Sequence, residues 1–278
     1  MASQLTVHLN NFSSDKASLV IYAHPNHELA TFGLLQRLRP HIVFLTDGGS
    51  EERLQQTREG LSGIGLLERA TFLNHREPEF YDALLRSDER FFASIAEAVR
   101  AAVMHAGAKQ IFCDAVEFYN PVHDLGLPIA HAALKGEDDA ALFELPLIFQ
   151  NNGSDESFVF QRPPQSRIAA SSNISLSEEE FEAKAAARDH AYTILVQQLA
   201  PQLRKVPREH WMNEYVFPAR EEVPRPAPDT RLRYEQRAAL LLERGEIAEP
   251  ILYREHYLPV ASALLGSPEA SGASATNR

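Results

Sequence analysis

The sequence contains a single cysteine, Cys113, among its 278 residues. One cysteine excludes an intramolecular disulfide, and its place in the apolar run 110–113 favours a small core residue over a nucleophile. Basic residues are also scarce, because 27 Lys and Arg stand against 38 Asp and Glu and give a formal net charge of -11. Nucleic acids and anionic membranes attract basic surfaces, so neither is an expected partner.

Long apolar runs are missing as well. No run approaches the ~20 apolar residues that a membrane-spanning helix needs, and the N-terminal stretch MASQLTVHLNNFSSDK lacks the basic-then-apolar order of a signal peptide. The content of 44% hydrophobic and 23% charged residues is typical of an ordinary globular protein. With the lone cysteine, these features favour a cytoplasmic protein.

What the chain does have is an alternation of short β-rich runs with helical patterns over its first two-thirds. The clearest helical pattern runs from about Arg86 to His105, with apolar residues on one face. The runs expected to be strands are 18–23, 41–46, 70–73, 110–116 and 145–149. Strands separated by helices of these lengths predict a parallel, doubly wound Rossmann-like α/β sheet.

The pattern changes after residue 150. A Ser-Leu-Ser-Glu sequence at 175–178 is typical of a helix start and predicts one long helix to about Leu199. A proline-rich connector over 218–228 precedes two further helical patterns. The chain is therefore expected to form an α/β domain over 1–205, an extension packed on it over 206–265, and a disordered tail over 266–278.

Three of the eleven histidines follow predicted strands. His24 and His27 come directly after the first strand, and His123 follows the fourth. Ligand sites of parallel sheets lie outside the carboxyl ends of the strands. The His-x-x-His spacing puts two imidazoles within one turn, close enough to share a cation at the ~2.0–2.1 Å of a zinc–nitrogen bond. These positions predict a site for a divalent metal.

The motifs around these histidines resemble those of the LmbE/PIG-L family of zinc-dependent N-deacetylases. Residues 23–28 read Ala-His-Pro-Asn-His-Glu where the family has Ala-His-Pro-Asp-Asp-Glu, and 46–48 match its Thr-Asp-Gly. Arg53 begins the family's Arg-x-x-Glu segment, with Gln56 in place of the glutamate, and 120–123 read Asn-Pro-Val-His for His-Pro-Asp-His. The match follows the family's order and spacing over roughly residues 17–200.

The resemblance implies that His24, His27 and His123 hold one divalent metal. It also implies hydrolysis of a C–N amide bond in an N-acylated small molecule. Zinc is the metal that the resemblance implies, and three neutral imidazoles suit it, since they lower the pKa of its bound water to ~7 in carbonic anhydrase. Iron, nickel and cobalt also accept three imidazoles, so they stay open, as does a homo-oligomeric state.

Both proton-transfer positions of the family are altered here. Asn26 stands at the position of the general base, and Asn120 at that of a histidine that assists as acid or orients the oxyanion. A carboxamide cannot accept a proton at useful pH, and general acid–base help is worth ~10²–10⁴-fold. Glu28, Asp47 and Asp124 are the nearest candidates for a relocated base, although acids in a first helical turn are favourable without any chemistry.

Arg53, His75 and Arg76 are the candidates for substrate contact. The last two follow the third strand, where the family often places a substrate-contacting acid, so the basic segment here is compatible with an anionic substrate. Three interpretations remain. We expect a hydrolase with a relocated base, and the alternatives are a three-histidine metalloenzyme of non-hydrolytic type, such as an iron enzyme, and a catalytically silent binding protein.

Overall fold

A sheet of mostly parallel strands forms the centre of the chain in the computed structural model, which describes residues 13, 15–150, 158–226 and 230–266. Among these residues its strand order is β3-β2-β1-β4-β5-β9-β8. The bounds are β1 Ser18–Tyr22, β2 His41–Thr46, β3 Ala70–His75, β4 Gln110–Asp114, β5 Ala141–Leu145, β8 Ser172–Ser175 and β9 Asn213–Pro218. The first five strands are parallel, and β9 is antiparallel to both β5 and β8. The predicted α/β, Rossmann-like fold is confirmed.

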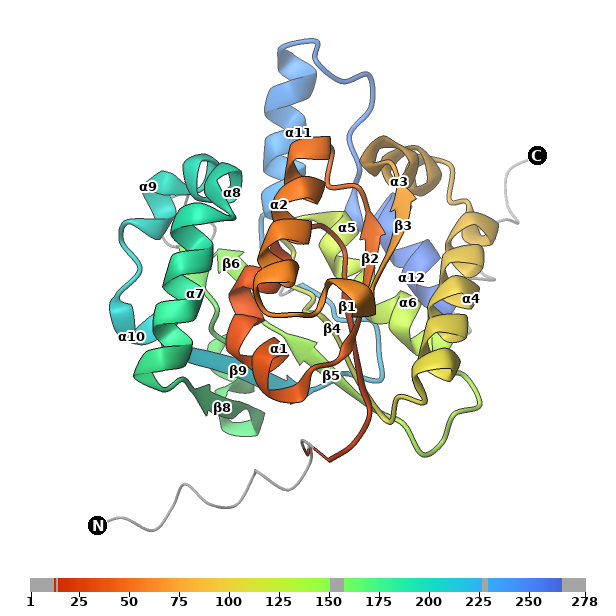
Figure 1. Cartoon of the computed structure of the whole chain (residues 1–278). Helices are drawn as coiled ribbons and strands as arrows, with labels where there is room; N and C mark the ends of the chain where they lie inside the picture. The colour runs from red at the N-terminus through yellow and green to blue at the C-terminus, as the bar shows by residue number, and fades with distance from the viewer. Residues whose placement is uncertain (1–12, 14, 151–157, 227–229, 267–278) are drawn as a thin grey trace, which may run out of the picture.

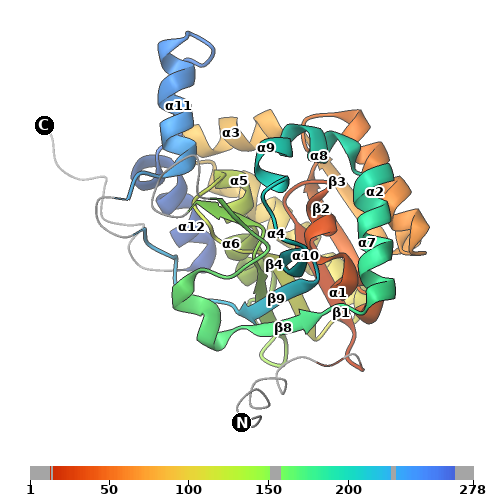
Figure 2. The same ribbon diagram turned by 90° about the vertical axis from the view of Figure 1, so that its left-hand side faces the viewer.

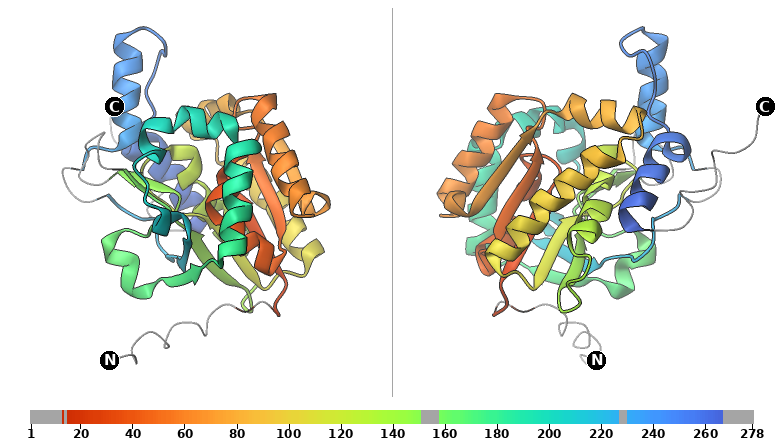
Figure 3. Two further views of the ribbon diagram at one scale, coloured as in Figure 1. Left: turned by 60° about the vertical axis from the view of Figure 1, so that its left-hand side comes forward. Right: turned by 90° about the vertical axis from the view of Figure 1, so that its right-hand side faces the viewer.

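The sequence of β1 explains why helices cover both faces of this sheet. Leu19 and Ile21 pack into the core on one face, and Val20 and Tyr22 pack into the core on the other. Because side chains alternate along a strand, an apolar strand buries both sets only between two helical layers. Figures 1 and 3 show these layers. One contains α1 Phe32–Leu38, α2 Glu51–Gly63 and α7 Glu178–His190, and the other contains α4 Glu89–Ala106, α6 Gly126–Ala133 and α12 Leu258–Leu265.

The remaining elements lie around the sheet. They are α3 Glu77–Leu85, α5 Pro121–Asp124, α8 Thr193–Gln198, α9 Ala200–Leu203, α10 Arg208–Trp211, α11 Arg233–Glu243, the 3-10 turns His27–Thr31, Leu67–Arg69 and Gln165–Ala170, a π-helical turn Tyr253–Tyr257, and a hairpin of β6 Ile148–Gln150 with β7 Phe158–Phe160. Figure 2 shows α8, α9 and α10 close to α7. In Figure 1, α3, α8 and α11 lie at the end of the molecule toward which β2 and β3 point.

Two elements differ from the prediction. The single helix expected over 175–199 is wrong, because α7, α8 and α9 replace it and Tyr192 is completely buried at the first break. A side chain at Gly60 would collide with the Tyr192 hydroxyl, so this close packing requires glycine. The strand expected over 145–149 is also wrong. In the structure β5 ends at Leu145 and β6 begins at Ile148. Pro146, which has no N–H to donate, lies between these two strands.

The segment 206–265 is closely joined to the sheet. It supplies β9, and its last helix, α12, packs against α4 and α6. The Tyr257 hydroxyl donates to the carbonyl of Asp124 at 2.9 Å. The division into units at residue 205 stays a prediction, and residues 267–278 of the expected tail lie outside the described residues. No helix in the described part of the chain is long and apolar enough to span a membrane.

Candidate functional site

The structure brings His24, His27 and His123 together at the carboxyl edge of the sheet. β1 and β4 are adjacent parallel strands, so the segments that follow them meet. The ring centroids of His24 and His27 are 5.2 Å apart, those of His24 and His123 4.8 Å, and those of His27 and His123 4.3 Å. All three side chains are buried. Residues almost a hundred positions apart therefore form one imidazole cluster.

Thr46 at the end of β2 fixes the orientation of His24. The Thr46 hydroxyl lies 2.7 Å from His24 Nδ1 and itself donates to the carbonyl of Ala23 at 2.8 Å. A hydroxyl has one hydrogen, so His24 Nδ1–H must be the donor in this pair. In the neutral ring, Nε2 then carries the lone pair, and Nε2 is buried with no hydrogen-bond partner among the described residues.

Asp114, the last residue of β4, does the same for His27. Its Oδ2 atom accepts from His27 Nδ1 at 2.8 Å and from the backbone N–H of Ala23 at 2.7 Å. A carboxylate that accepts Nδ1–H keeps the proton on Nδ1, so the lone pair of Nε2 is free to bind a metal. Carboxylates are common outer partners of metal-binding histidines in this way. Asp114 was not among the predicted site residues, and Thr46 had a place only in the Thr-Asp-Gly match, although both residues end strands at the edge where the histidines lie.

The protonation state of the cluster follows from its burial. Burial lowers the pKa of His24 and of His123 well below the usual value, and the neighbouring His27 lowers both further. Both rings are therefore neutral at physiological pH, which is the form that binds a metal. His123 Nδ1 is a further buried atom without a hydrogen-bond partner in the described ranges.

The donor set fits a divalent cation in its chemistry. Its three imidazoles are the ligands that zinc, iron, nickel and cobalt accept. Two of them have the fixed Nδ1 atoms that metal-binding histidines usually show. Among residues 13, 15–150, 158–226 and 230–266, however, no three His, Cys, Asp or Glu side chains already stand in the arrangement of a complete metal site. The rings would have to adjust to share an ion.

A cavity of about 1170 Å³ opens beside the histidines. Its polar lining near them includes Asn26, Arg53, Glu77, Tyr81 and Asn120. Its apolar lining includes Leu85, Leu147, Ile148, Phe160, Leu195, Leu199, Ala238, Leu241, Ile247 and Ile251. The cluster therefore stands at a cavity that combines a polar end with extensive apolar walls.

Asn26 and Arg53 support each other at the edge of this cavity. Asn26 has a φ of 77°, and its Nδ2 donates to the carbonyl of Arg53 at 3.2 Å and to Thr57 Oγ1 at 3.1 Å. Arg53 Nε donates to Asn26 Oδ1 at 3.3 Å, and its Nη1 donates to the carbonyl of Gly48 at 3.0 Å. These contacts use every polar atom of the Asn26 side chain. Asn120 is likewise engaged, since its Oδ1 caps α5 by accepting from the N–H of Val122 at 2.8 Å.

The three carboxylates expected as relocated bases, Glu28, Asp47 and Asp124, do not line the cavity. Glu28 is fully buried, and this burial raises its pKa. Asp47 Oδ1 accepts from the backbone N–H groups of Gly49 at 2.8 Å and Glu77 at 3.2 Å. Asp47 therefore stabilises its turn, and Thr46 is the residue that orients a histidine.

Asp124 is also turned into the protein. Its Oδ1 accepts from the backbone N–H groups of Glu117 at 2.9 Å and Phe118 at 3.2 Å. Burial raises the pKa of Asp124 to about 7, against the effect of these hydrogen bonds. Asp124 is the last residue of α5, and its carboxylate binds the loop that precedes this helix. These contacts explain why it does not reach the cavity.

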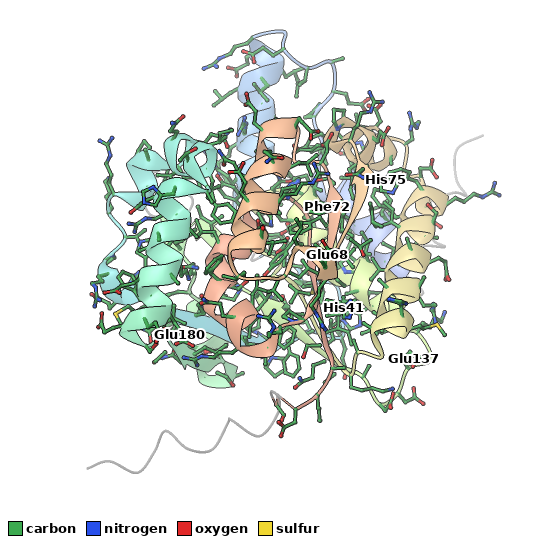
Figure 4. All side chains as sticks on the ribbon, viewed as in Figure 1. His41, Glu68, Phe72, His75, Glu137 and Glu180 are labelled. Atoms are coloured by element: carbon green, nitrogen blue, oxygen red, sulfur yellow. The ribbon has the colours of Figure 1, made fainter. Side chains whose placement is uncertain are left out.

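Of the three residues expected to contact substrate, the structure brings only Arg53 to the cavity. The ring of His75, labelled in Figure 4, packs against Phe91 with centroids 5.4 Å apart. Arg76 is 72% exposed and pairs with Glu79 at 3.1 Å. The next residue, Glu77, does line the cavity and was not among the predicted site residues. The sequence offered one indication of this role, because Glu77 directly follows the predicted residues His75 and Arg76 and begins α3.

No family model and no curated protein matches this chain. Several solved structures are similar to it. A deacetylase triple mutant of the teicoplanin biosynthetic pathway shares 12% identity at a TM-score of 0.48, covering 73% of this chain and 97% of that one. The A40926 pseudoaglycone deacetylase Dbv21 shares 14% at 0.47, covering 73% and 96%. The conserved protein TT1542 from Thermus thermophilus shares 19% at 0.48, covering 78% and 99%. At these identities the chemistry of the site depends on this chain's own residues.

Proposed function

We propose that this protein is a metal-dependent hydrolase of C–N amide bonds that acts on an N-acylated small molecule. The observation that carries the proposal is the buried cluster of His24, His27 and His123, in which Thr46 and Asp114 engage two Nδ1 atoms. The motif resemblance to the LmbE/PIG-L family supports the same reaction. A divalent cation held by these histidines would supply Lewis acidity toward an amide carbonyl.

The residues around the cluster have separable roles. Arg53 places a positive charge at the cavity wall, where it can bind an anionic or carbonyl oxygen of the substrate. The Tyr81 hydroxyl donates to Glu77 Oε1 at 2.7 Å, which orders the acidic side of the same wall. Asn26 and Asn120, the altered positions of the family, hold the local backbone and transfer no proton.

The size and lining of the cavity support a substrate larger than an N-acetylated monosaccharide. About 1170 Å³ exceeds the ~300–1,000 Å³ typical of small-molecule pockets. Apolar side chains such as Leu147, Phe160 and Leu199 offer a surface for a long acyl chain or an aromatic group. We therefore expect kcat/KM for N-acyl amino sugars to rise with the length of the acyl chain.

A second candidate is a three-histidine metalloenzyme of non-hydrolytic type. It is favoured by the asparagines at both proton-transfer positions and by the absence of Glu28, Asp47 and Asp124 from the cavity lining in the described structure. Such a centre binds substrate or dioxygen at the metal and needs no general base. The metal that copurifies separates the candidates, since zinc favours hydrolysis and iron favours the second.

The first experiment is metal analysis of the purified protein beside the variants His24→Ala and His123→Ala. We expect about one equivalent in the wild type and a large loss in both variants. His75→Ala is the matched control, because its ring packs against Phe91 outside the cavity. A wild-type protein with no more metal than the two site variants would overturn the proposal. Release of free amine from short- and long-chain N-acyl amino sugars then tests the reaction.

A further inference from the structure

Glu77 is the acidic side chain that meets the histidine cluster on the cavity side. Its Oε1 lies 3.9 Å from His24 Nε2, and its side chain is 21% exposed where that of His24 is 2% exposed. Within the described part of the chain, the carboxylates in ion-pair contact with the three histidines are Glu77 and Asp114. Asp114 contacts Nδ1 of His27, so Glu77 is the one that approaches an Nε2 atom.

The distance between these two atoms is informative. At 3.9 Å, His24 Nε2 and Glu77 Oε1 are too far apart for a hydrogen bond. His24 Nε2 has no hydrogen-bond partner elsewhere in the described residues. Two ligand atoms that are each ~2.0–2.2 Å from one cation lie ~3.4 Å apart at the tetrahedral angle and ~4.0–4.4 Å apart on opposite sides of the ion. The observed 3.9 Å falls between these limits, so a small movement of either side chain lets both atoms share a cation.

Charge balance gives the same result. His27 stands at a position where the LmbE/PIG-L motif has an aspartate, so this chain has lost one negative charge among its three expected ligands. Three neutral imidazoles bring no negative charge to a divalent ion, and Asp114 reaches it only through His27, so part of the ion's charge stays uncompensated in buried surroundings, which is costly. Glu77 follows β3, whereas His27 follows β1, so its carboxylate can restore that negative charge from a second strand.

The surroundings of Glu77 hold its carboxylate in place. Tyr81, one turn along α3, donates its hydroxyl to Oε1 at 2.7 Å, and Asp47 accepts the N–H of Glu77 at 3.2 Å. Gly49, at a φ of 80°, leaves room beside Oε2, because a Cβ there would stand 3.2 Å from that oxygen.

The geometry points to Glu77 as the anionic ligand of a three-histidine, one-glutamate metal centre, an inference that rests on the metal of the proposed function. Four protein ligands fill the tetrahedral shell that zinc takes in structural sites, so a zinc ion held this way would have to expand to five ligands, as catalytic zinc does, to polarise an amide carbonyl. A cation that accepts five or six ligands, such as iron, keeps positions for substrate. Glu77 thus links the ligand set of this chain to the choice of metal.

The test is titration of the metal-free protein with Co²⁺, followed by its visible absorption spectrum and by calorimetry. Loss of an outer partner costs ~10–100-fold in metal affinity, so Glu77→Gln should lower Co²⁺ affinity by at least about 100-fold and change the spectrum. The amide oxygen of glutamine can still accept from Tyr81, so the fold should survive. Asp82→Asn is the matched control, since it removes the same charge from the same helix and cavity wall.

Each outcome decides the inference. Unchanged affinity and spectrum in Glu77→Gln, or an equal loss in Asp82→Asn, would overturn the ligand role while leaving the three-histidine metal site intact. A wild-type protein that binds no Co²⁺ would overturn this role together with the proposed function. Should the glutamine variant unfold, Glu77→Asp decides, because its shorter side chain should weaken binding and wild-type affinity would refute the ligand role.

Discussion

The change Thr46→Val removes one hydroxyl from the buried cluster and keeps the shape of the side chain. The Thr46 hydroxyl accepts from His24 Nδ1 at 2.7 Å and from the N–H of Gly48 at 3.2 Å, and it donates to the carbonyl of Ala23 at 2.8 Å. That carbonyl also accepts the backbone N–H of Thr46 at 3.0 Å, so it keeps a partner. Two buried donors therefore lose their acceptor, His24 Nδ1–H and the N–H of Gly48.

The expected magnitude follows from this count. Each buried donor left without a partner costs ~1–3 kcal/mol, so two of them lower the free energy of unfolding by ~2–6 kcal/mol. The ring of His24 can relieve the loss by moving its proton to Nε2, which removes the lone pair offered to a metal. We therefore expect metal affinity to fall by ~10–100-fold, the usual cost of losing an outer partner.

Urea unfolding of the metal-free protein and calorimetric titration with Zn²⁺ measure the two effects separately. Thr57→Val is the matched control. Thr57 is fully buried and its hydroxyl accepts both the backbone N–H and Nδ2 of Asn26, at 2.9 and 3.1 Å, without contact to a histidine nitrogen. It should lose similar stability with little loss of affinity. If Thr46→Val binds Zn²⁺ as tightly as the wild type, His24 Nε2 is not a ligand and the reasoning fails.

Three further predictions concern stability and are measured by urea unfolding. Lys184→Met should lower the free energy of unfolding by ~3–5 kcal/mol, because it breaks a fully buried ion pair of 2.7 Å with Glu214. A decrease below ~1 kcal/mol would contradict this. Asn26→Asp should cost ~1–2 kcal/mol, since a carboxylate cannot donate to the carbonyl of Arg53; equal or greater stability would count against the described contacts. Glu180, marked in Figure 4, has its pKa lowered to about 2 by its arginine partner. A lowered pKa gives stability that is present above the ordinary 4.5 and is lost as pH falls toward 2. Glu180→Gln should therefore cost ~0.5–1 kcal/mol at neutral pH and almost nothing near pH 2, and a pH-independent difference would refute the assignment.

The sequence determined the parts of this protein that depend on local pattern. Apolar runs of strand length predicted β1, β2 and β4 to within a few residues, because burial on both faces requires an unbroken apolar strand. The same pattern placed His24, His27 and His123 after strands, and parallel strands bring such residues to one edge. The sequence thus placed the three rings at one edge of the sheet, and the pairing of β1 with β4, which brings them together, came from the structure.

Only the tertiary structure decided what surrounds them. Asp114 reaches His27 across 87 residues, and Glu77 faces His24 because α3 begins beside the β2 turn. The same sequence pattern favoured Glu28, Asp47 and Asp124, none of which is among the residues that line the cavity. A side chain's direction depends on rotamer and on neighbours distant in the chain, which periodicity and spacing do not record.

The break between α7 and α8 has the same origin. The stretch 175–199 has a helix start and helix-forming residues, so local propensity favours one continuous helix. Burial of Tyr192 against the backbone of Gly60 ends α7 early instead. Local propensity amounts to tenths of a kcal/mol per residue, whereas burial of an aromatic side chain is worth ~1.5–3 kcal/mol. Where the two compete, packing between distant segments determines the structure, and only the folded chain shows which segments meet.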